Sequence, residues 1–95
     1  MMTEKICNGK RYDISYSEML GLWVCEEGTA EYSSVWEWLF KTEDGDFFVY
    51  RMATRDAKKE KLEEDIVPLT LEEAKIWVTK HLDADDYNRY FGKEE

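Results

Sequence analysis

Two apolar, aromatic-rich runs within residues 34–54 flank the polar segment Glu43-Asp44-Gly45-Asp46, and this pattern predicts a central β-hairpin. An Asp-Gly pair between two such runs favours a two-residue type I′ loop. In that register Phe40 faces Val49. Both faces of the hairpin would then be partly apolar, so we expect one face to pack on a helix. The other would be covered by another segment of the chain or by a partner.

The first 25 residues predict three further strands. Asn8-Gly9 lies between two short extended runs, which is a strong signal for a tight hairpin. Residues 19–25 form an apolar run that indicates a third strand. Within it, Gly21 suggests a β-bulge or a close approach of the backbone to a neighbour.

The segment after the central hairpin changes character twice. Residues 55–65 are almost wholly charged and have little apolar periodicity, so we expect an exposed loop or a frayed helical turn. Residues 66–69 should be extended because the residue before Pro68 avoids helical backbone angles. A proline also favours the edge of a sheet or the end of a strand.

The C-terminal third predicts two helices. Thr70 and Glu73 have the spacing of a capping box, which marks a helix start. Asp83 is a suitable N-cap for a second helix over residues 84–91, with Gly92 as its stop and Tyr87, Tyr90 and Phe91 on its inner face. The apolar stripe of the first helix, expected to lie on the sheet, consists of Leu71, Ala74, Trp77, Val78, His81 and Leu82.

Strands followed by helices indicate an α+β fold. We expect one domain over residues 1–95, with an antiparallel sheet of about four to six strands, including the N-terminal and central hairpins. One or two C-terminal helices would pack on one face of that sheet. A charged fraction of 37% alone would suggest disorder, but aromatic residues make up 15% of the chain and supply enough buried area for it to fold.

The composition also bears on the compartment. The N-terminal residues lack the apolar run of a signal peptide, and no apolar run approaches the roughly 20 residues of a membrane helix. Cys7 and Cys25 are too few for a disulfide-built domain, so we expect two free, half-buried thiols. These features predict a cytoplasmic protein.

Negative charge is concentrated in residues 13–46, which hold nine acidic side chains and only Lys41 as a base, a net charge of −8 out of −9 for the chain. Tryptophans are interleaved with these carboxylates. Aromatic side chains and carboxylates together suit a basic protein partner. The predicted partner-binding residues are Glu26, Glu27, Glu31, Trp36, Glu37, Trp38, Asp44 and Asp46. The two tryptophans are the best anchors, although core positions are an alternative for both.

Candidate chemistry is sparse, and we predict no catalytic, cofactor or metal site and no enzyme activity. His81 is the only histidine, and neither cysteine lies in a nucleophile motif. The aspartates near residue 83 fit helix capping and lack the pattern of a calcium loop. Direct nucleic-acid binding is disfavoured, because phosphate contacts depend on lysine and arginine in excess.

Several segments resemble a group of small, mostly uncharacterised acidic proteins of Gram-positive mobile elements and phages. They are residues 8–13, the hairpin 37–50, and the stretch 66–92 with its Ile-Val-Pro-Leu-Thr start. In that group the hairpin often begins Glu-x-Leu-Tyr; Glu37 and Leu39 match, whereas Phe40 replaces the tyrosine. The loop before the proline is charged here, where the group tends to carry glycine and asparagine. The resemblance implies no catalytic residues, and it implies the context of anti-CRISPR or other anti-defence proteins.

Two functions follow as hypotheses. The first is a non-enzymatic inhibitor whose acidic, aromatic surface occupies a cationic nucleic-acid-binding site, a CRISPR effector nuclease being the candidate partner. The alternative is a small structural or regulatory protein of a mobile element that forms a homodimer through its aromatic sheet face. Salt separates the two, because screening weakens an electrostatic complex and leaves an apolar interface intact.

Overall fold

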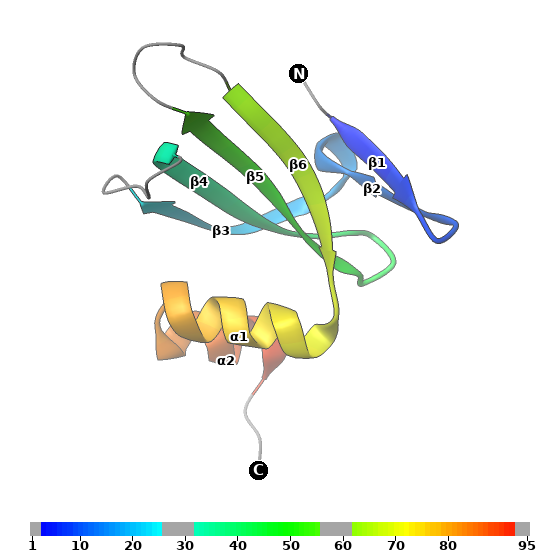
Figure 1. The fold of residues 1–95 in the computed structure, drawn as a ribbon. Coiled ribbons are helices and arrows are strands. Elements are labelled where there is room, and N and C mark those ends of the chain that lie inside the picture. Colours follow the sequence, from blue (N-terminus) through cyan, green and yellow to red (C-terminus); the bar gives the residue numbers. More distant parts are fainter. Residues whose placement is uncertain (1–2, 26–31, 56–61, 93–95) are drawn as a thin grey trace.

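The computed structural model describes residues 3–25, 32–55 and 62–92. These residues form an α+β fold of six strands and two C-terminal helices, as the sequence predicts (Figure 1). The elements are β1 Glu4–Cys7, β2 Lys10–Asp13, a 3₁₀ turn η1 Ile14–Tyr16, β3 Glu18–Cys25, β4 Tyr32–Lys41, β5 Phe47–Arg55, β6 Leu62–Leu69, α1 Leu71–His81 and α2 Ala84–Phe91.

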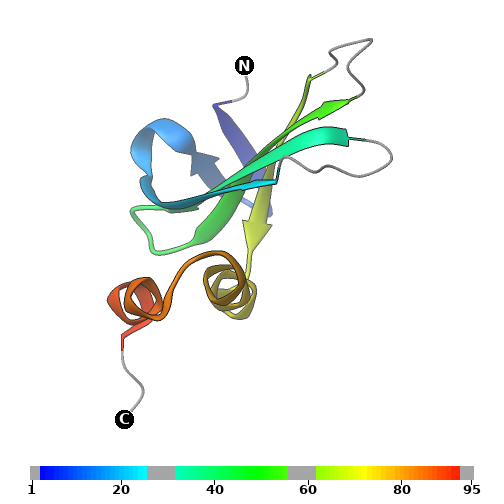
Figure 2. The same cartoon turned by 90° about the vertical axis from the view of Figure 1, so that its left-hand side faces the viewer.

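The strands form two antiparallel sheets, a two-stranded sheet β1-β2 and a four-stranded sheet in the order β3-β4-β5-β6. Figures 1 and 2 show both helices together on one side of the larger sheet, and we call this its inner face. The β1-β2 hairpin packs on the opposite side, the outer face, where Tyr12 contacts Phe48 with ring centroids 5.7 Å apart. The chain therefore has three layers: helices, sheet and hairpin.

The N-terminal hairpin has the predicted tight turn. Asn8 and Gly9 have φ angles of 53° and 76°, the left-handed values that a type I′ turn requires at both central positions. Lys5 fixes the hairpin to the larger sheet, because its Nζ donates to the carbonyl oxygen of Ile66 at 3.1 Å and pairs with Asp65 at 3.2 Å.

The central hairpin forms, but its predicted register is wrong by one residue. The Thr42 amide donates to the Asp46 carbonyl at 2.8 Å, and the Gly45 amide donates to the Thr42 carbonyl at 3.0 Å. Gly45 is the position with positive φ, at 89°, which gives a three-residue loop in place of the two-residue type I′ loop. Phe40 consequently faces Phe48 and not Val49.

The one-residue change decides which side chains share a face, because side chains alternate along a strand. Large apolar side chains of β4 and β5 gather on the outer face, where Trp36 pairs with Met52 and Trp38 with Tyr50. The inner face receives Phe47 and a set of smaller apolar residues. They include Leu39 opposite Val49.

The charged segment 55–65 is only partly as predicted. Residues 62–65 belong to β6 and Arg55 ends β5, so the expectation of a loop or helical turn is wrong at both ends. Backbone pairing with β5, such as Arg51 with Asp65, outweighs the poor strand propensity of these charged residues. The middle of the predicted loop lies outside the described residues. Pro68 lies on the edge strand, as expected.

Both helices begin as predicted, and α2 also ends as predicted. The Thr70 hydroxyl accepts from the Glu73 amide at 3.1 Å, and the Glu73 carboxylate accepts from the Thr70 amide at 2.9 Å, which completes the capping box. Asp83 caps α2 through the Asp86 amide at 2.9 Å, and α2 ends before Gly92, whose φ is 74°. One expected position of the α1 stripe is wrong: Leu71 is 51% exposed, and the buried stripe begins one turn later.

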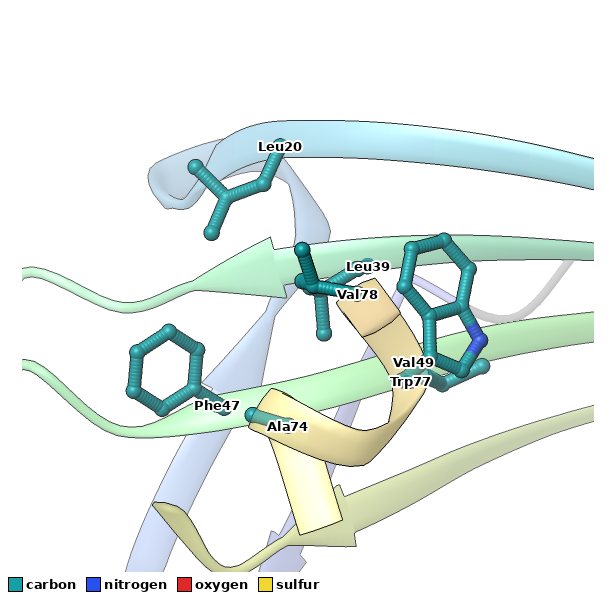
Figure 3. Close-up of a cluster of buried hydrophobic side chains, with 7 residues drawn as sticks. All are labelled: Leu20, Leu39, Phe47, Val49, Ala74, Trp77 and Val78. Carbon is teal, nitrogen blue, oxygen red and sulfur yellow. The ribbon is translucent and has the colours of Figure 1, made fainter. Parts of the chain in front are cut away.

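The core on the inner face joins α1 to three strands (Figure 3). Its buried members are Leu20, Leu39, Phe47, Val49, Ala74, Trp77 and Val78. Tyr87, Tyr90 and Phe91 of α2 pack against this cluster, as predicted.

Gly21 has both of the roles that the sequence suggests. The β3–β4 register shifts between Met19 and Gly21, which marks a β-bulge. A side chain at Gly21 would place its Cβ only 2.7 Å from Leu82 Cδ1, so the helix packs directly on the backbone at this point. Cys7 and Cys25 are free and half-buried, as expected.

Candidate partner-binding surface

The outer face of the four-stranded sheet is divided into a covered half and an open half. The N-terminal hairpin covers the half nearest the β4–β5 turn. Buried there are Tyr12, Phe40, Phe48, Tyr50 and Ile66. Phe48 and Ile66 are fully buried, so this half is a second hydrophobic core and not a surface.

The open half consists of five apolar side chains, which we call the open patch: Leu22, Val24, Trp36, Trp38 and Met52. The register places them on the same face, because directly paired residues project to the same side of a sheet. Leu22 is 46% exposed and Val24 is 37% exposed, while the two tryptophans and the methionine are half-buried.

Tyr50 marks the boundary between the two halves. Its ring stacks on Trp38 with centroids 5.3 Å apart, and its hydroxyl donates to the Glu64 carboxylate. Burial is the larger cause and this hydrogen bond the smaller one that together raise the pKa of Tyr50 to about 12. The apolar surface thus runs without a break from the core under the hairpin into the open patch.

The inner face at the same end of the sheet has the opposite character. Glu37 lies between Trp36 and Trp38 in sequence and projects to this side, where it accepts from Trp77 Nε1 at 2.8 Å and lies 3.6 Å from Arg51 Nε. Asp65, paired with Arg51 in the sheet, is exposed on the same face. This part of the inner face therefore combines a partly exposed ion pair with a hydrogen bond to α1, whereas the open patch on the outer face is apolar.

His81 lies on the inner side, in an aromatic contact that the sequence did not indicate. Its ring stacks on Trp23 with centroids 4.2 Å apart and meets Trp77 edge-on at 5.0 Å. Burial lowers the pKa of His81, and the nearby Glu37 carboxylate opposes that effect. Cys7 packs on the outer side, across the sheet, so these two residues do not form a catalytic pair.

The structure separates the predicted site residues. Trp36 and Trp38 share the open patch, whereas Glu37 faces the helices. Asp44 is exposed in the β4–β5 turn, and Asp46 pairs with Lys10 at 3.0 Å. Glu26, Glu27 and Glu31 lie outside the described residues.

A shallow groove near the β4–β5 turn combines carboxylates with an exposed aromatic ring. Asp13, Glu43 and Asp44 line it together with Tyr16, which is 67% exposed. Arg11 pairs with Asp13 at 2.9 Å and is the cation among the residues that line this groove. The groove is open, and it offers negative charge without an enclosed ligand cavity.

Comparison with known proteins does not assign the chain to a family. No protein-family model, curated protein or solved structure matches it. Within the ranges that the structure describes, no three histidine, cysteine or carboxylate side chains group as metal ligands would. Neither α1 nor α2 is long and apolar enough to cross a bilayer.

Sequence reasoning missed three members of the open patch, Leu22, Val24 and Met52. The signal was present, because Leu22 and Val24 alternate with Trp23 along the third predicted strand. Deciding which of the two alternating sets faces a helix requires the tertiary structure. Here His81 covers Trp23, whereas Leu22 and Val24 each keep more than a third of their surface exposed.

Proposed function

We propose that the protein is a non-enzymatic inhibitor that binds a cationic, nucleic-acid-handling protein through the open patch and exposed carboxylates. A CRISPR effector nuclease is the first candidate partner. The observation that carries the proposal is the contrast at one end of the sheet, where the inner face has ion pairs and the outer face exposes Leu22 and Val24.

The apolar contribution comes from the open patch. Aromatic side chains dominate many interfaces when they sit at the centre of a contact and are shielded from water by their neighbours. Trp36 and Trp38 have this position, since each lies in an interior strand between apolar residues of the strands on either side. Each is already half-buried, so less side-chain entropy is lost on binding than for a free side chain.

The electrostatic contribution comes from the net charge of −9. Such a charge steers the protein toward a positive surface and raises the association rate, an effect that salt weakens. It also opposes the face-to-face homodimer that is the alternative, because both copies carry the same charge. The groove lined by Glu43 and Asp44 supplies exposed carboxylates for contacts with lysine or arginine.

A cleavage assay with a purified CRISPR effector nuclease tests the proposal. We expect the wild-type protein to slow DNA cleavage and to lose affinity as the salt concentration rises. The double variant Trp36→Ser, Trp38→Ser should bind at least about tenfold more weakly, as expected for the loss of two interface aromatics. A matched control is Leu71→Ser, Ile76→Ser, which removes two exposed apolar side chains from α1, on the other side of the sheet.

Charge reversal tests the electrostatic contribution to binding separately from the apolar contribution. The triple variant Glu26→Lys, Glu27→Lys, Glu31→Lys should abolish inhibition, whereas Glu72→Lys, Glu73→Gln on α1 should not. Thermal melting of each variant establishes that it is folded. Equal inhibition by the wild type and both site variants would refute the mode of binding, and no binding to any nucleic-acid-handling nuclease would refute the partner class.

A further inference from the structure

We infer that two copies of the chain pair through their β3 edges and join their open patches into one surface. This inference goes beyond the proposed inhibitor function and does not depend on the identity of the partner. It starts from a difference between the two edges of the four-stranded sheet, β3 and β6 (Figure 1).

The β6 edge is protected against strand pairing in the ways that natural sheets use. Pro68 lacks an amide hydrogen, and Asp65 places a charge on the strand. Lys5 from the neighbouring hairpin donates to the Ile66 carbonyl at 3.1 Å. A strand from another molecule would have to displace this contact and approach a charged edge.

The β3 edge has little of this protection. The segment 19–25 contains no charged residue and no proline. Among the described strands β3 pairs only with β4, so the other side of its backbone has no strand neighbour there. At the bulge end of β3 the Tyr90 hydroxyl donates to the Leu20 carbonyl at 2.5 Å and Leu82 packs on Gly21. Farther along, His81 of α1 stacks on the Trp23 side chain from the inner face. For residues 22–25, no described strand pairs with the side of the backbone that faces away from β4.

A second copy fits this edge because the edge is self-complementary. Antiparallel pairing about a two-fold axis at Trp23 places Leu22 of one copy opposite Val24 of the other. Both residues are exposed and apolar on the outer face, so the pair covers them reciprocally. Residues 19–25 carry no charge themselves, and repulsion between the acidic residues that flank them in the two copies is screened over about 8 Å at physiological salt.

Pairing in this way also enlarges the proposed binding surface. One open patch contains five side chains, whereas a stable protein interface usually takes roughly 20–30 residues from each side. In the paired sheet both outer faces lie on the same side, with Leu22 and Val24 of each copy at the seam. Trp36 and Trp38 of both copies then contribute to one continuous apolar surface.

The mass of the protein in solution, measured by sedimentation equilibrium from about 1 µM to about 1 mM, tests the inference. We expect a transition from the chain mass of 11.4 kDa to twice that value. Val24→Lys should weaken self-association roughly tenfold or more, because it places a charge in the seam. Val67→Lys is the matched control, since Val67 lies on the other edge strand and is also 37% exposed.

Amide hydrogen exchange of the unmodified chain supplies a readout that does not require a variant to fold. Amides among residues 22–25 should gain protection as the concentration rises, and those of β6 should not. A single-chain mass at every concentration would overturn the inference and leave the edge to a strand of a different protein. If Val24→Lys and Val67→Lys both left the dimer intact, pairing through the β3 edges would be refuted in favour of face-to-face pairing.

The inference and the proposed function fail in different experiments. Self-association is measured without any nuclease, so a dimer that does not inhibit cleavage would refute the function alone. A monomer that inhibits cleavage would refute the pairing alone.

Discussion

The two faces of the four-stranded sheet differ in how far other elements cover their apolar side chains. The inner face packs against α1 and α2 through an apolar cluster, and next to this cluster it carries the Glu37–Arg51 ion pair, with buried Val35 and Ala53 beyond it. The outer face carries apolar side chains in both its covered half and its open half, with Glu64, hydrogen-bonded to Tyr50, among its few polar residues. Since isolated exposed apolar residues are common but a contiguous patch is not, the open patch supports the proposal of a surface that contacts another molecule.

The comparison also shows how the strands specify both faces at once. In β4, Trp36 and Trp38 project outward while Glu37 projects inward between them. A single strand therefore presents a carboxylate to α1 on one side and two half-buried tryptophans to the open patch on the other. If the open patch were merely an extension of the core, the hairpin would be expected to extend over it.

The largest expected effect separates the covered half of the outer face from the open half. Phe48→Ala, in the covered half, should lower the free energy of unfolding by about 3–5 kcal/mol, because it leaves a cavity in a fully buried site. Leu22→Ala, in the open half, should change it by less than about 1 kcal/mol. Urea denaturation of both variants measures the difference. Similar losses would mean that the open patch is buried in the free protein.

Local signals account for the parts of the fold that the sequence predicts well. The Asn8-Gly9 turn, the Thr70 capping box and the Pro68 edge each depend on the conformational preferences of a few neighbouring residues. Those preferences persist in the folded chain, so a short window is sufficient. Gly21 is a similar case, because its lack of a side chain already suggests a close approach of another element.

The remaining features depend on contacts between distant segments. The Asp44-Gly45 pair suits both a two-residue and a three-residue loop, and that single residue decides which side chains face Phe40. Residues 62–65 become a strand because β5 offers a partner, although their own composition favours a loop. The site shows the same limit: alternation along the strand already places Trp36 and Trp38 on the face opposite Glu37, but the neighbours of the two tryptophans across the hairpin follow only from the register.

An intermediate loss of stability is expected when Glu37 on the inner face is replaced by an apolar residue. Glu37→Leu removes the acceptor of the Trp77 indole N–H, a group that lies in a largely buried residue. We expect a loss of about 1–3 kcal/mol in the free energy of unfolding, the cost of a buried donor without its partner. The test is a double-mutant cycle with Trp77→Phe, in which the two losses should be less than additive. Strict additivity would show that the hydrogen bond does not couple the helix to the sheet.

The smallest expected effect concerns Tyr50, at the boundary of the two outer halves. Burial and the hydrogen bond to Glu64 raise the pKa of Tyr50 to about 12 from the ordinary value of 10.0, so the folded state favours the neutral phenol. The corresponding stabilisation is complete below pH 10, the unfolded value, and is lost as the pH rises through about 12. Tyr50→Phe should cost about 1 kcal/mol at neutral pH and remove this part of the alkaline decline.

Ultraviolet absorbance of the phenolate follows the titration of Tyr50, and urea denaturation between pH 9 and pH 12 follows the free energy of unfolding. Tyr50→Phe is the reference in both measurements. The chain has other tyrosines, so the titration of Tyr50 is the difference between the wild type and this variant. A difference spectrum that appears near pH 10 would place Tyr50 in contact with water, and the open half would then begin at Tyr50. A difference that appears only near pH 12 would place the boundary beyond it, at Trp38, where the proposed binding surface starts.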